Sequence, residues 1–168
     1  MYRKNIKYWG EVMEKVVITN KKELNARHKS ESVGYEYFKY LPIEEGINNQ
    51  CAVMFYDIPP KKSNYPYHYH GSDVEIFYII SGRGQVKTEE GIKDISSGDL
   101  IICPSGKMAA HKITNTSEAE NFCYIEFDTI HKPEVIKYPH SKKIGIVNME
   151  GDSRFFREKD NKEYYDGE

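Results

Sequence analysis

The chain has 168 residues, of which 39% are hydrophobic and 30% are charged, and its formal net charge is −2. This length fits one ordinary domain with a real core, and the charge balance offers no basic footprint for nucleic acid. No apolar stretch approaches the roughly 20 residues that a membrane helix requires. We therefore expect a single domain over residues 1–168, with no nucleic-acid partner and no membrane partner.

The beginning of the chain and its cysteines indicate the compartment. Residues Met1 to Lys7 lack the apolar run of a signal peptide. Cys51, Cys103 and Cys123 are odd in number and lie within apolar segments, which favours reduced, buried thiols over a disulfide framework. We expect a cytoplasmic protein.

The predicted elements are mostly short strands. One helix is expected first, over Asn20 to Lys29, with Thr19 as its N-cap. Segments rich in β-branched and aromatic residues follow, separated by Gly, Pro, Asn or Ser, at 35–40, 51–58, 74–81, 85–89, 92–95, 100–103, 111–114 and 122–127. Many short, evenly spaced strands predict an all-β sandwich or barrel. We expect its core at about residues 33–130, between an N-terminal extension and a C-terminal tail.

The segment from His68 to Gly82 predicts a metal site. His68 and His70 are two apart, so on a strand both side chains point to the same face, about 6.6 Å apart along the strand. Glu75 lies within an apolar run, where a carboxylate needs a partner and a cation is the natural one. The alternative is an exposed turn followed by an ordinary strand with one edge Glu.

A second segment supplies a further imidazole. Residues 98–106 read as a turn, a short apolar strand and a second turn, and His111 and Asn115 follow them. Three of the chain's six His therefore fall in the two segments.

Together the two segments resemble the two motifs of the cupin superfamily, G-x5-H-x-H-x3/4-E-x6-G and G-x5-P-x-G-x2-H-x3-N. The first matches from His68 to Gly82, with Ser63 near its start in place of Gly, and the second has two extra residues between Gly106 and His111. The resemblance implies a cupin-type double-stranded β-helix, a small β-barrel or jelly roll. It also implies one divalent transition metal per chain (Fe, Mn, Ni, Co or Zn), held by His68, His70, Glu75 and His111.

The C-terminal segment, residues 150–168, is strongly charged yet contains Phe155-Phe156 and Tyr164-Tyr165. Its polarity favours a disordered tail, whereas four large rings favour a docked one. Together with residues 133–140, this ending resembles a group of uncharacterised single-domain cupins, and the likeness carries no known activity.

Strand parity predicts what surrounds the site. If Glu75 faces the barrel interior, Phe77 and Ile79 do so too. Tyr65, Tyr67 and Tyr69 have the opposite parity to the two His and should line the outer face, as sheet packing or as contacts to a ligand or a partner subunit. Cys103 is expected to be a buried inert thiol, with a reactive thiol as the alternative.

These observations favour a metal-dependent enzyme that acts on a small oxygen-bearing molecule. Four protein ligands leave two positions of an octahedral metal open, which indicates a dioxygenase in which Glu75 accepts a substrate proton. The alternatives are a non-catalytic small-molecule binding or sensing module and a sugar isomerase. Because open sheet edges favour pairing, and because the chain resembles known dimeric cupins, we also expect a homodimer.

Overall fold

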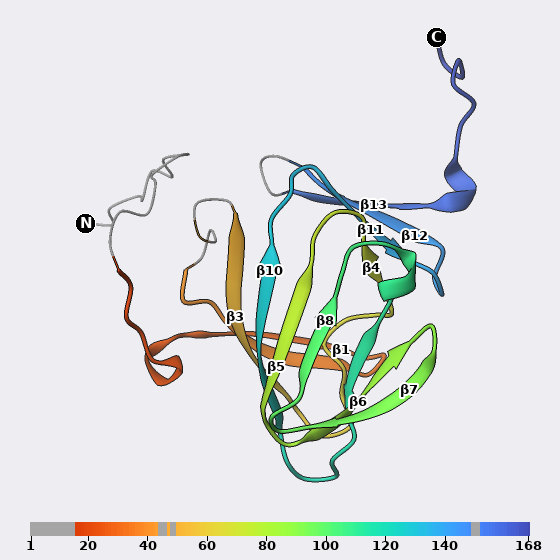
Figure 1. Ribbon diagram of the computed structural model, residues 1–168. Coiled ribbons are helices and arrows are strands. Elements are labelled where there is room, and N and C mark those ends of the chain that lie inside the picture. Colours follow the sequence, from red (N-terminus) through yellow and green to blue (C-terminus); the bar gives the residue numbers. More distant parts are fainter. Residues whose placement is uncertain (1–15, 44–46, 48–49, 149–151) are drawn as a thin grey trace.

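The structure is a computed structural model that describes residues 16–43, 47, 50–148 and 152–168, and this part of the chain is almost entirely antiparallel β-structure (Figure 1). Only three single-turn 3-10 helices interrupt it there: η1 (Lys21–Glu23), η2 (Lys107–Ala109) and η3 (Glu158–Asp160). The strands are β1 (Ala26–Glu31), β2 (Tyr35–Tyr40), β3 (Cys51–Ile58), β4 (Tyr69–His70), β5 (Glu75–Ser81), β6 (Arg83–Thr88), β7 (Gly91–Ser96), β8 (Leu100–Cys103), β9 (Lys112–Asn115), β10 (Phe122–Thr129), β11 (Glu134–Tyr138), β12 (Lys143–Val147) and β13 (Ser153–Arg157).

The described strands form three sheets that enclose a barrel. The largest has the order β1-β2-β3-β10-β5-β8, a second has the order β7-β6-β9, and a third has the order β13-β12-β11-β4. The third sheet covers one end of the barrel, and the chain beyond β13 extends away from it (Figure 1). None of the described helices is long and apolar enough to cross a membrane. The sheets confirm the predicted all-β barrel.

Period-two alternation builds the core of this barrel. On β10, Phe122, Tyr124 and Glu126 are buried, whereas the side chains between them lie on the outer face. On β5, Glu75, Phe77 and Ile79 are at most 5% exposed, as strand parity predicts. The interior is therefore an apolar and aromatic core that carries carboxylates on two neighbouring, paired strands.

Tyrosine hydroxyls and one asparagine satisfy each other within this core. The Tyr56 and Tyr65 hydroxyl oxygens are 2.9 Å apart, and Asn64 Nδ2 donates a hydrogen bond of 2.7 Å to the Tyr124 hydroxyl. The Tyr56 and Tyr124 rings stack with their centroids 5.2 Å apart. These partners allow rings that carry polar groups to be fully buried.

The predicted helix over Asn20 to Lys29 is wrong. Only one 3-10 turn forms there, capped by Asn20, whose side chain accepts a hydrogen bond of 3.0 Å from the Lys22 N–H. The following residues form β1, which pairs with β2 along its full length. Cross-strand pairing and the stacking of His28 on Phe38, with centroids 4.3 Å apart, outweigh the local helix propensity.

One further expectation is wrong, and one alternative that the sequence left open is decided in part. Tyr65 packs against the core instead of lining the outer surface. The prediction assumed that the alternation of the strand around His68 and His70 continues back to Tyr65, but Tyr65 precedes Pro66 and lies before β4. The C-terminal segment is partly docked: β13 pairs with β12, and the Phe155 ring packs against Tyr138 at 6.1 Å. Tyr164 and Tyr165 are 88% and 79% exposed and contact only each other among the described rings.

Gly82, in the tight β5–β6 connection, generates a prediction about stability. Its φ is +85°, and a Cβ there would lie 2.6 Å from the Asn121 carbonyl oxygen. We expect Gly82→Ala to lower the free energy of unfolding by about 2–4 kcal/mol, because it adds backbone strain and overpacking. Urea denaturation measures the change.

Gly98 is the matched control for this substitution. Its φ of +94° is similar, but nothing lies within 4 Å of the position that a Cβ would take there, so Gly98→Ala carries the backbone cost alone. An equal loss of stability in the two variants would show that the contact with Asn121 has no effect.

Candidate metal centre

The two motif segments meet through a reciprocal backbone bridge. His68 N–H donates to the His111 carbonyl at 3.1 Å, and His111 N–H donates to the His68 carbonyl at 2.8 Å. The two extra residues after Gly106 are accommodated by the η2 turn. His111 therefore lies beside His68 in the barrel, as the spacing of the second motif predicts.

Four side chains converge at this point. The Nε2 atoms of His68, His70 and His111 lie 3.7, 3.5 and 3.3 Å from the Glu75 carboxylate oxygens. Glu75, His68 and His111 are at most 6% exposed, and the His70 side chain is 14% exposed. The structure thus brings together all four side chains that the sequence predicts for the site.

Backbone carbonyls orient two of the imidazoles. Because a carbonyl oxygen can only accept, His68 Nδ1–H donates to Pro66 at 2.8 Å and His111 Nδ1–H donates to Ala109 at 3.1 Å. These bonds leave Nε2 of both rings, on the side of Glu75, as the nitrogen that can take a metal or a proton. Such partners on the far nitrogen are typical of metal-binding histidines.

His70 has an acidic neighbour in place of a carbonyl. Its Nδ1 lies 3.5 Å from Glu134 Oε1, and that same oxygen accepts hydrogen bonds from the Gly71 and Ser72 N–H groups at 2.8 and 3.1 Å. Glu134, on β11, is only 2% exposed. The sheet that covers the barrel end holds the His70 backbone through the pairing of β4 with β11, whereas His70 Nδ1 has no hydrogen-bond partner among the described residues.

The electrostatics favour an ionised carboxylate with a neutral imidazole beside it. Burial opposes the ionised form of Glu75, but the His68, His70 and His111 imidazoles hold the pKa of Glu75 below its usual value. Burial lowers the pKa of His111, against the attraction of Glu75. For His70, burial lowers the pKa, but Glu75 and Glu134 raise it overall.

This donor set fits a divalent transition metal. Three imidazole nitrogens and one carboxylate are ligands that such ions take in proteins. Ligand atoms of His68, His70 and Glu75 all lie within 4.8 Å of one another, and His111 Nε2 lies 3.3 Å from the second Glu75 oxygen. Among the described residues, Glu75 has no other hydrogen-bond donor to neutralise it.

A buried acid pair lies beside these four residues, and sequence reasoning missed it. Carboxylate oxygens of Glu75, Glu126 and Asp128 lie within 4.8 Å of one another, and one oxygen each of Glu126 and Asp128 has no hydrogen-bond partner. Burial, and then the neighbouring carboxylates, raise the pKa of Glu126 well above its usual value and that of Asp128 to about 7. The sequence did contain one indication of it. Glu126 and Asp128 follow Phe122 and Tyr124 at intervals of two residues, so on a strand all four side chains point to the same face.

A cavity of about 150 Å³ reaches Asp128 of this acid pair. His70, Asp73, Asp128 and Glu134 supply its polar lining, and Ala52, Ile130, Ile136 and Val147 are among its apolar neighbours. Asp73 is held by His131, whose Nδ1 lies 2.9 Å from the carboxylate. A small molecule in this cavity would face both a candidate metal ligand and a carboxyl group.

Cys103 lies opposite Glu75 in the β5–β8 ladder. Burial, and then Glu75 and Glu126, raise the pKa of its thiol to about 12. The thiol is therefore protonated near neutral pH and a poor nucleophile, in agreement with the expected inert cysteine.

The family comparison places these residues in a known domain. Residues 54–126 match the sequence profile of the cupin domain. No curated protein matches the chain.

Solved structures share the fold at low sequence identity. A proposed sugar phosphate isomerase from Acidithiobacillus ferrooxidans superposes with a TM-score of 0.75 at 22% identity, covering 88% of this chain and 95% of its own. A cupin sugar phosphate isomerase from Silicibacter pomeroyi gives 0.74 at 16% identity, covering 89% and 98%. A predicted oxalate decarboxylase from Thermotoga maritima gives 0.61 at 21% identity, covering 68% and 100%.

The matched profile and the structural likeness coincide on the same part of the molecule. The profile spans the strands of the barrel from β3 to β10 and includes all four converging side chains. Residues 54–126 therefore match the cupin domain, and the solved structures show that the chain shares their fold.

Proposed function

We propose that the protein is a metal-dependent enzyme that moves a proton between neighbouring carbons of a small hydroxycarbonyl compound, as an isomerase does. The observation that carries this proposal is the second acid beside the four donors: Asp128 lines the cavity next to His70 and has a buried oxygen without a partner. Binding alone requires the cation and its ligands. An additional unpaired carboxyl group is costly to bury and suits proton transfer.

Four side chains would hold the metal, namely His68, His70 and His111 through Nε2 and Glu75 through its carboxylate. A bound divalent cation supplies a Lewis acid that polarises a carbonyl group. Three neutral imidazoles and one carboxylate leave a formal charge of +1 on the complex, and a six-coordinate ion keeps two positions for a bidentate substrate. Fe, Mn, Ni and Co suit this role better than Zn, which four protein ligands tend to close.

Asp128 is placed to carry the proton. Its carboxylate takes the proton from the carbon that bears the hydroxyl group and returns it to the adjacent carbonyl carbon, while the hydroxyl proton passes to the carbonyl oxygen. The exchange is redox-neutral, so it needs no external oxidant. Glu126, buried behind Asp128 and with its pKa raised, stays protonated and can donate a hydrogen bond to the Asp128 carboxylate.

The named relatives support the same reaction class. The two structures with TM-scores of 0.75 and 0.74 are described as sugar phosphate isomerases. Their sequence identity to this chain is low. The proposal therefore rests on the acid pair of this chain, and the descriptions of the two structures are consistent with it.

Two other functions use the same donors differently. A dioxygenase would place O2 and substrate at the two remaining metal positions, with Glu75 as the base, and has no use for Asp128. A binding or sensing module would need no proton transfer. A dioxygenase would consume O2, whereas an isomerase would not. A binding or sensing module would show no turnover at all.

The metal assignment predicts the behaviour of a double variant. Replacing His68 and His70 together with Ala removes two of four ligands, so we expect stoichiometric Mn or Fe binding to be abolished while the barrel stays folded. Elemental analysis and circular dichroism measure the two properties. His28→Ala, at an exposed histidine on β1, is the control and should keep one ion per chain. Metal content that survives the double change would refute the assignment.

The proposed mechanism predicts different losses of metal binding and turnover for variants of Asp128 and Glu75. Asp128→Asn should retain the metal and lower isomerase turnover by about 10²–10⁴-fold, because it removes the proton carrier. Glu75→Gln should weaken metal binding in part and lower turnover by about 10²-fold or more. The measurement is aldose–ketose conversion over a panel of sugars and sugar phosphates with each reconstituted metal.

The control for these variants is Asp94→Asn, at an exposed carboxylate on β7. Full activity in Asp128→Asn would remove Asp128 from the mechanism. O2 consumption coupled to a substrate would favour the dioxygenase, and tight metal-dependent binding without turnover would favour the sensing module.

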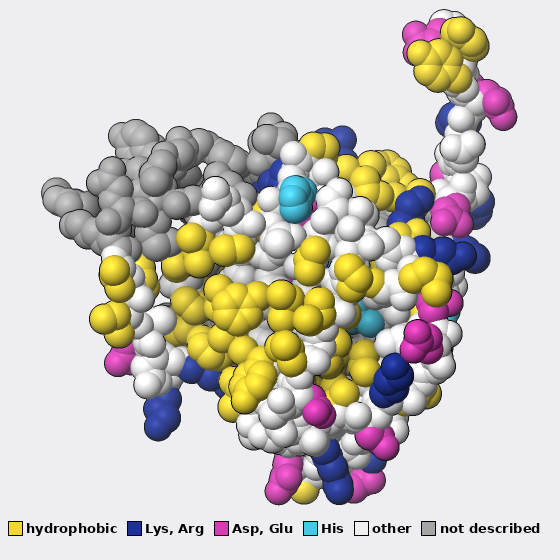
Figure 2. Space-filling model, viewed as in Figure 1, with side chains coloured by type: hydrophobic (Ala, Val, Ile, Leu, Met, Phe, Trp, Pro, Cys, Tyr) yellow, Lys and Arg dark blue, Asp and Glu magenta, His cyan; other side chains and the backbone are white. Residues whose placement is uncertain are grey.

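We also propose that the chain forms a homodimer through the outer face of its largest sheet. Large apolar side chains on the neighbouring strands β10, β5 and β8 are 42–60% exposed and gather into one patch in Figure 2; they are Phe127, Tyr78, Ile80, Leu100 and Ile102. Contiguous exposed patches of this kind mark interaction sites. An uncharged apolar patch is complementary to itself, and a two-fold dimer requires that property.

Sedimentation at micromolar concentration tests the dimer. We expect the wild type to sediment as a dimer and Ile102→Asp to sediment as a monomer, because the variant would bury a charge in the interface. Ile92→Asp is the control, since Ile92 is similarly exposed at 63% but lies on β7, outside this sheet. A monomeric wild type would exclude the dimer.

A further inference from the structure

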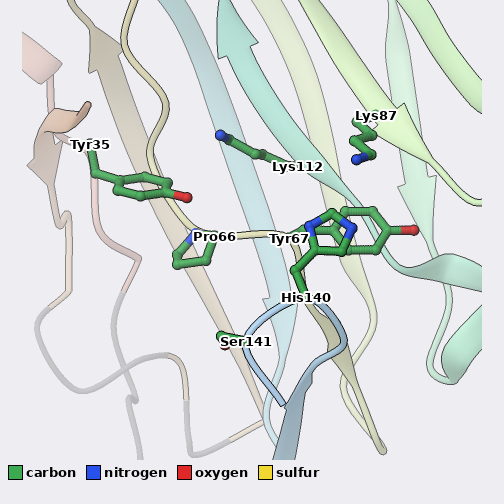
Figure 3. Close-up of a pocket in the computed structure, with 7 residues that line it drawn as sticks. All are labelled: Tyr35, Pro66, Tyr67, Lys87, Lys112, His140 and Ser141. Carbon is green, nitrogen blue, oxygen red and sulfur yellow. The ribbon is translucent and has the colours of Figure 1, made fainter. Parts of the chain in front are cut away.

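A second pocket lies on the outer side of the His68–His111 bridge. It has a volume of about 220 Å³ and is lined by Tyr35, Tyr67, Lys87, Lys112, His140 and Ser141 (Figure 3). Tyr67 and Lys112 are the direct neighbours of His68 and His111, and alternation along the bridged segments turns their side chains to the opposite face. The pocket is therefore separate from the barrel interior and from the candidate metal centre.

Two lysines on neighbouring strands border this pocket. Lys87 on β6 and Lys112 on β9 are directly opposite each other in the antiparallel ladder, an arrangement that destabilises a sheet when the charges are alike. No described carboxylate forms an ion pair with either lysine. By contrast, Lys61, Lys62 and Lys93 each pair with a glutamate on the same molecule. The pocket is thus bordered by two lysines without an ion-pair partner among the described residues, and the nearby Glu89 carboxylate accepts the Tyr67 hydroxyl instead.

Aromatic rings hold both ammonium groups in place. Lys112 Nζ lies 4.9 Å from the centroid of the Tyr35 ring, and Lys87 Nζ lies 5.4 Å from that of Tyr67. The His140 ring stacks on Tyr67 with centroids 4.5 Å apart. Tyr67 itself is 5% exposed, and its hydroxyl donates to Glu89 at 2.8 Å, which fixes the ring. These contacts therefore hold the two ammonium groups against aromatic rings, of which Tyr67 is itself fixed.

We propose that this pocket binds a phosphate group, either inorganic phosphate or a small phosphate monoester. Two ammonium groups, the His140 imidazole and the Ser141 hydroxyl provide charge and hydrogen-bond donors around one hollow (Figure 3). Its volume is below the ~300–1,000 Å³ of pockets for drug-sized ligands, which restricts the ligand to a small anion or a short organic phosphate. The Tyr35 and Tyr67 rings can pack against the organic part of an ester.

The proposal does not depend on the proposed function, so the experiment uses chelator-treated, metal-free full-length protein. Isothermal titration calorimetry with inorganic phosphate and, separately, with phenyl phosphate gives the affinity of each source. We expect Lys87→Met and Lys112→Met each to weaken binding by about tenfold or more, because each removes a charge-assisted contact and keeps the side-chain stem on its ring. Tighter binding of phenyl phosphate would identify an ester as the preferred ligand, and equal or tighter binding of inorganic phosphate would identify the free ion.

Two controls locate the binding. Lys93→Met removes one positive charge from the neighbouring strand β7 and should leave the affinity unchanged, as should the His68→Ala, His70→Ala double variant. The proposal is overturned if neither phosphate binds, or if both lysine variants bind as tightly as the wild type. Binding lost in the histidine double variant but kept in the lysine variants would place the anion inside the barrel and would also overturn it.

Discussion

The reciprocal backbone bridge between His68 and His111 is the contact on which both proposed sites depend. It joins two segments that lie far apart in the sequence and fixes their register. Because side chains alternate across such a ladder, the same bridge turns two imidazoles toward the barrel interior and turns Tyr67 and Lys112 outward. One short ladder thereby builds a candidate metal centre on one face and a positively charged pocket on the other.

The barrel interior must also accommodate buried carboxylates. Glu75, Glu126 and Asp128 face one another inside it, and Glu134 closes the end through β11. Burial of so many acids is unfavourable unless each is paired or protonated. Glu75 is surrounded by imidazoles, and one oxygen of Glu134 accepts two backbone N–H groups. Glu126, Asp128 and Glu134 each keep one oxygen without a partner, but only Glu126 and Asp128 also have raised pKa values. Of these last two, Asp128 lines the cavity where proton transfer would occur.

Sequence reasoning predicted the barrel and the convergence of the four donors because both follow from local patterns. Strand alternation placed Glu75, Phe77 and Ile79 inside, and motif spacing indicated His111 despite two extra residues that the η2 turn accommodates. Sequence reasoning failed where contacts between distant parts of the chain determine the local structure. Pairing with β2 made a strand of residues expected to be helical, Tyr65 was misassigned by extending strand parity past Pro66, and the phosphate pocket needs β6, β9 and the β11–β12 turn together. The acid pair was visible as alternation on β10, but nothing in the sequence alone showed that β10 faces Glu75.

The central claim is that three imidazoles and Glu75 bind one divalent ion within the barrel. X-ray absorption spectroscopy of the wild-type protein reconstituted with one equivalent of Mn(II) or Fe(II) tests it most directly. The account predicts a first shell of nitrogen and oxygen with the multiple-scattering pattern of three imidazoles. A shell of oxygen atoms without imidazole scattering would contradict it, because the ion would then lie at the carboxylates alone.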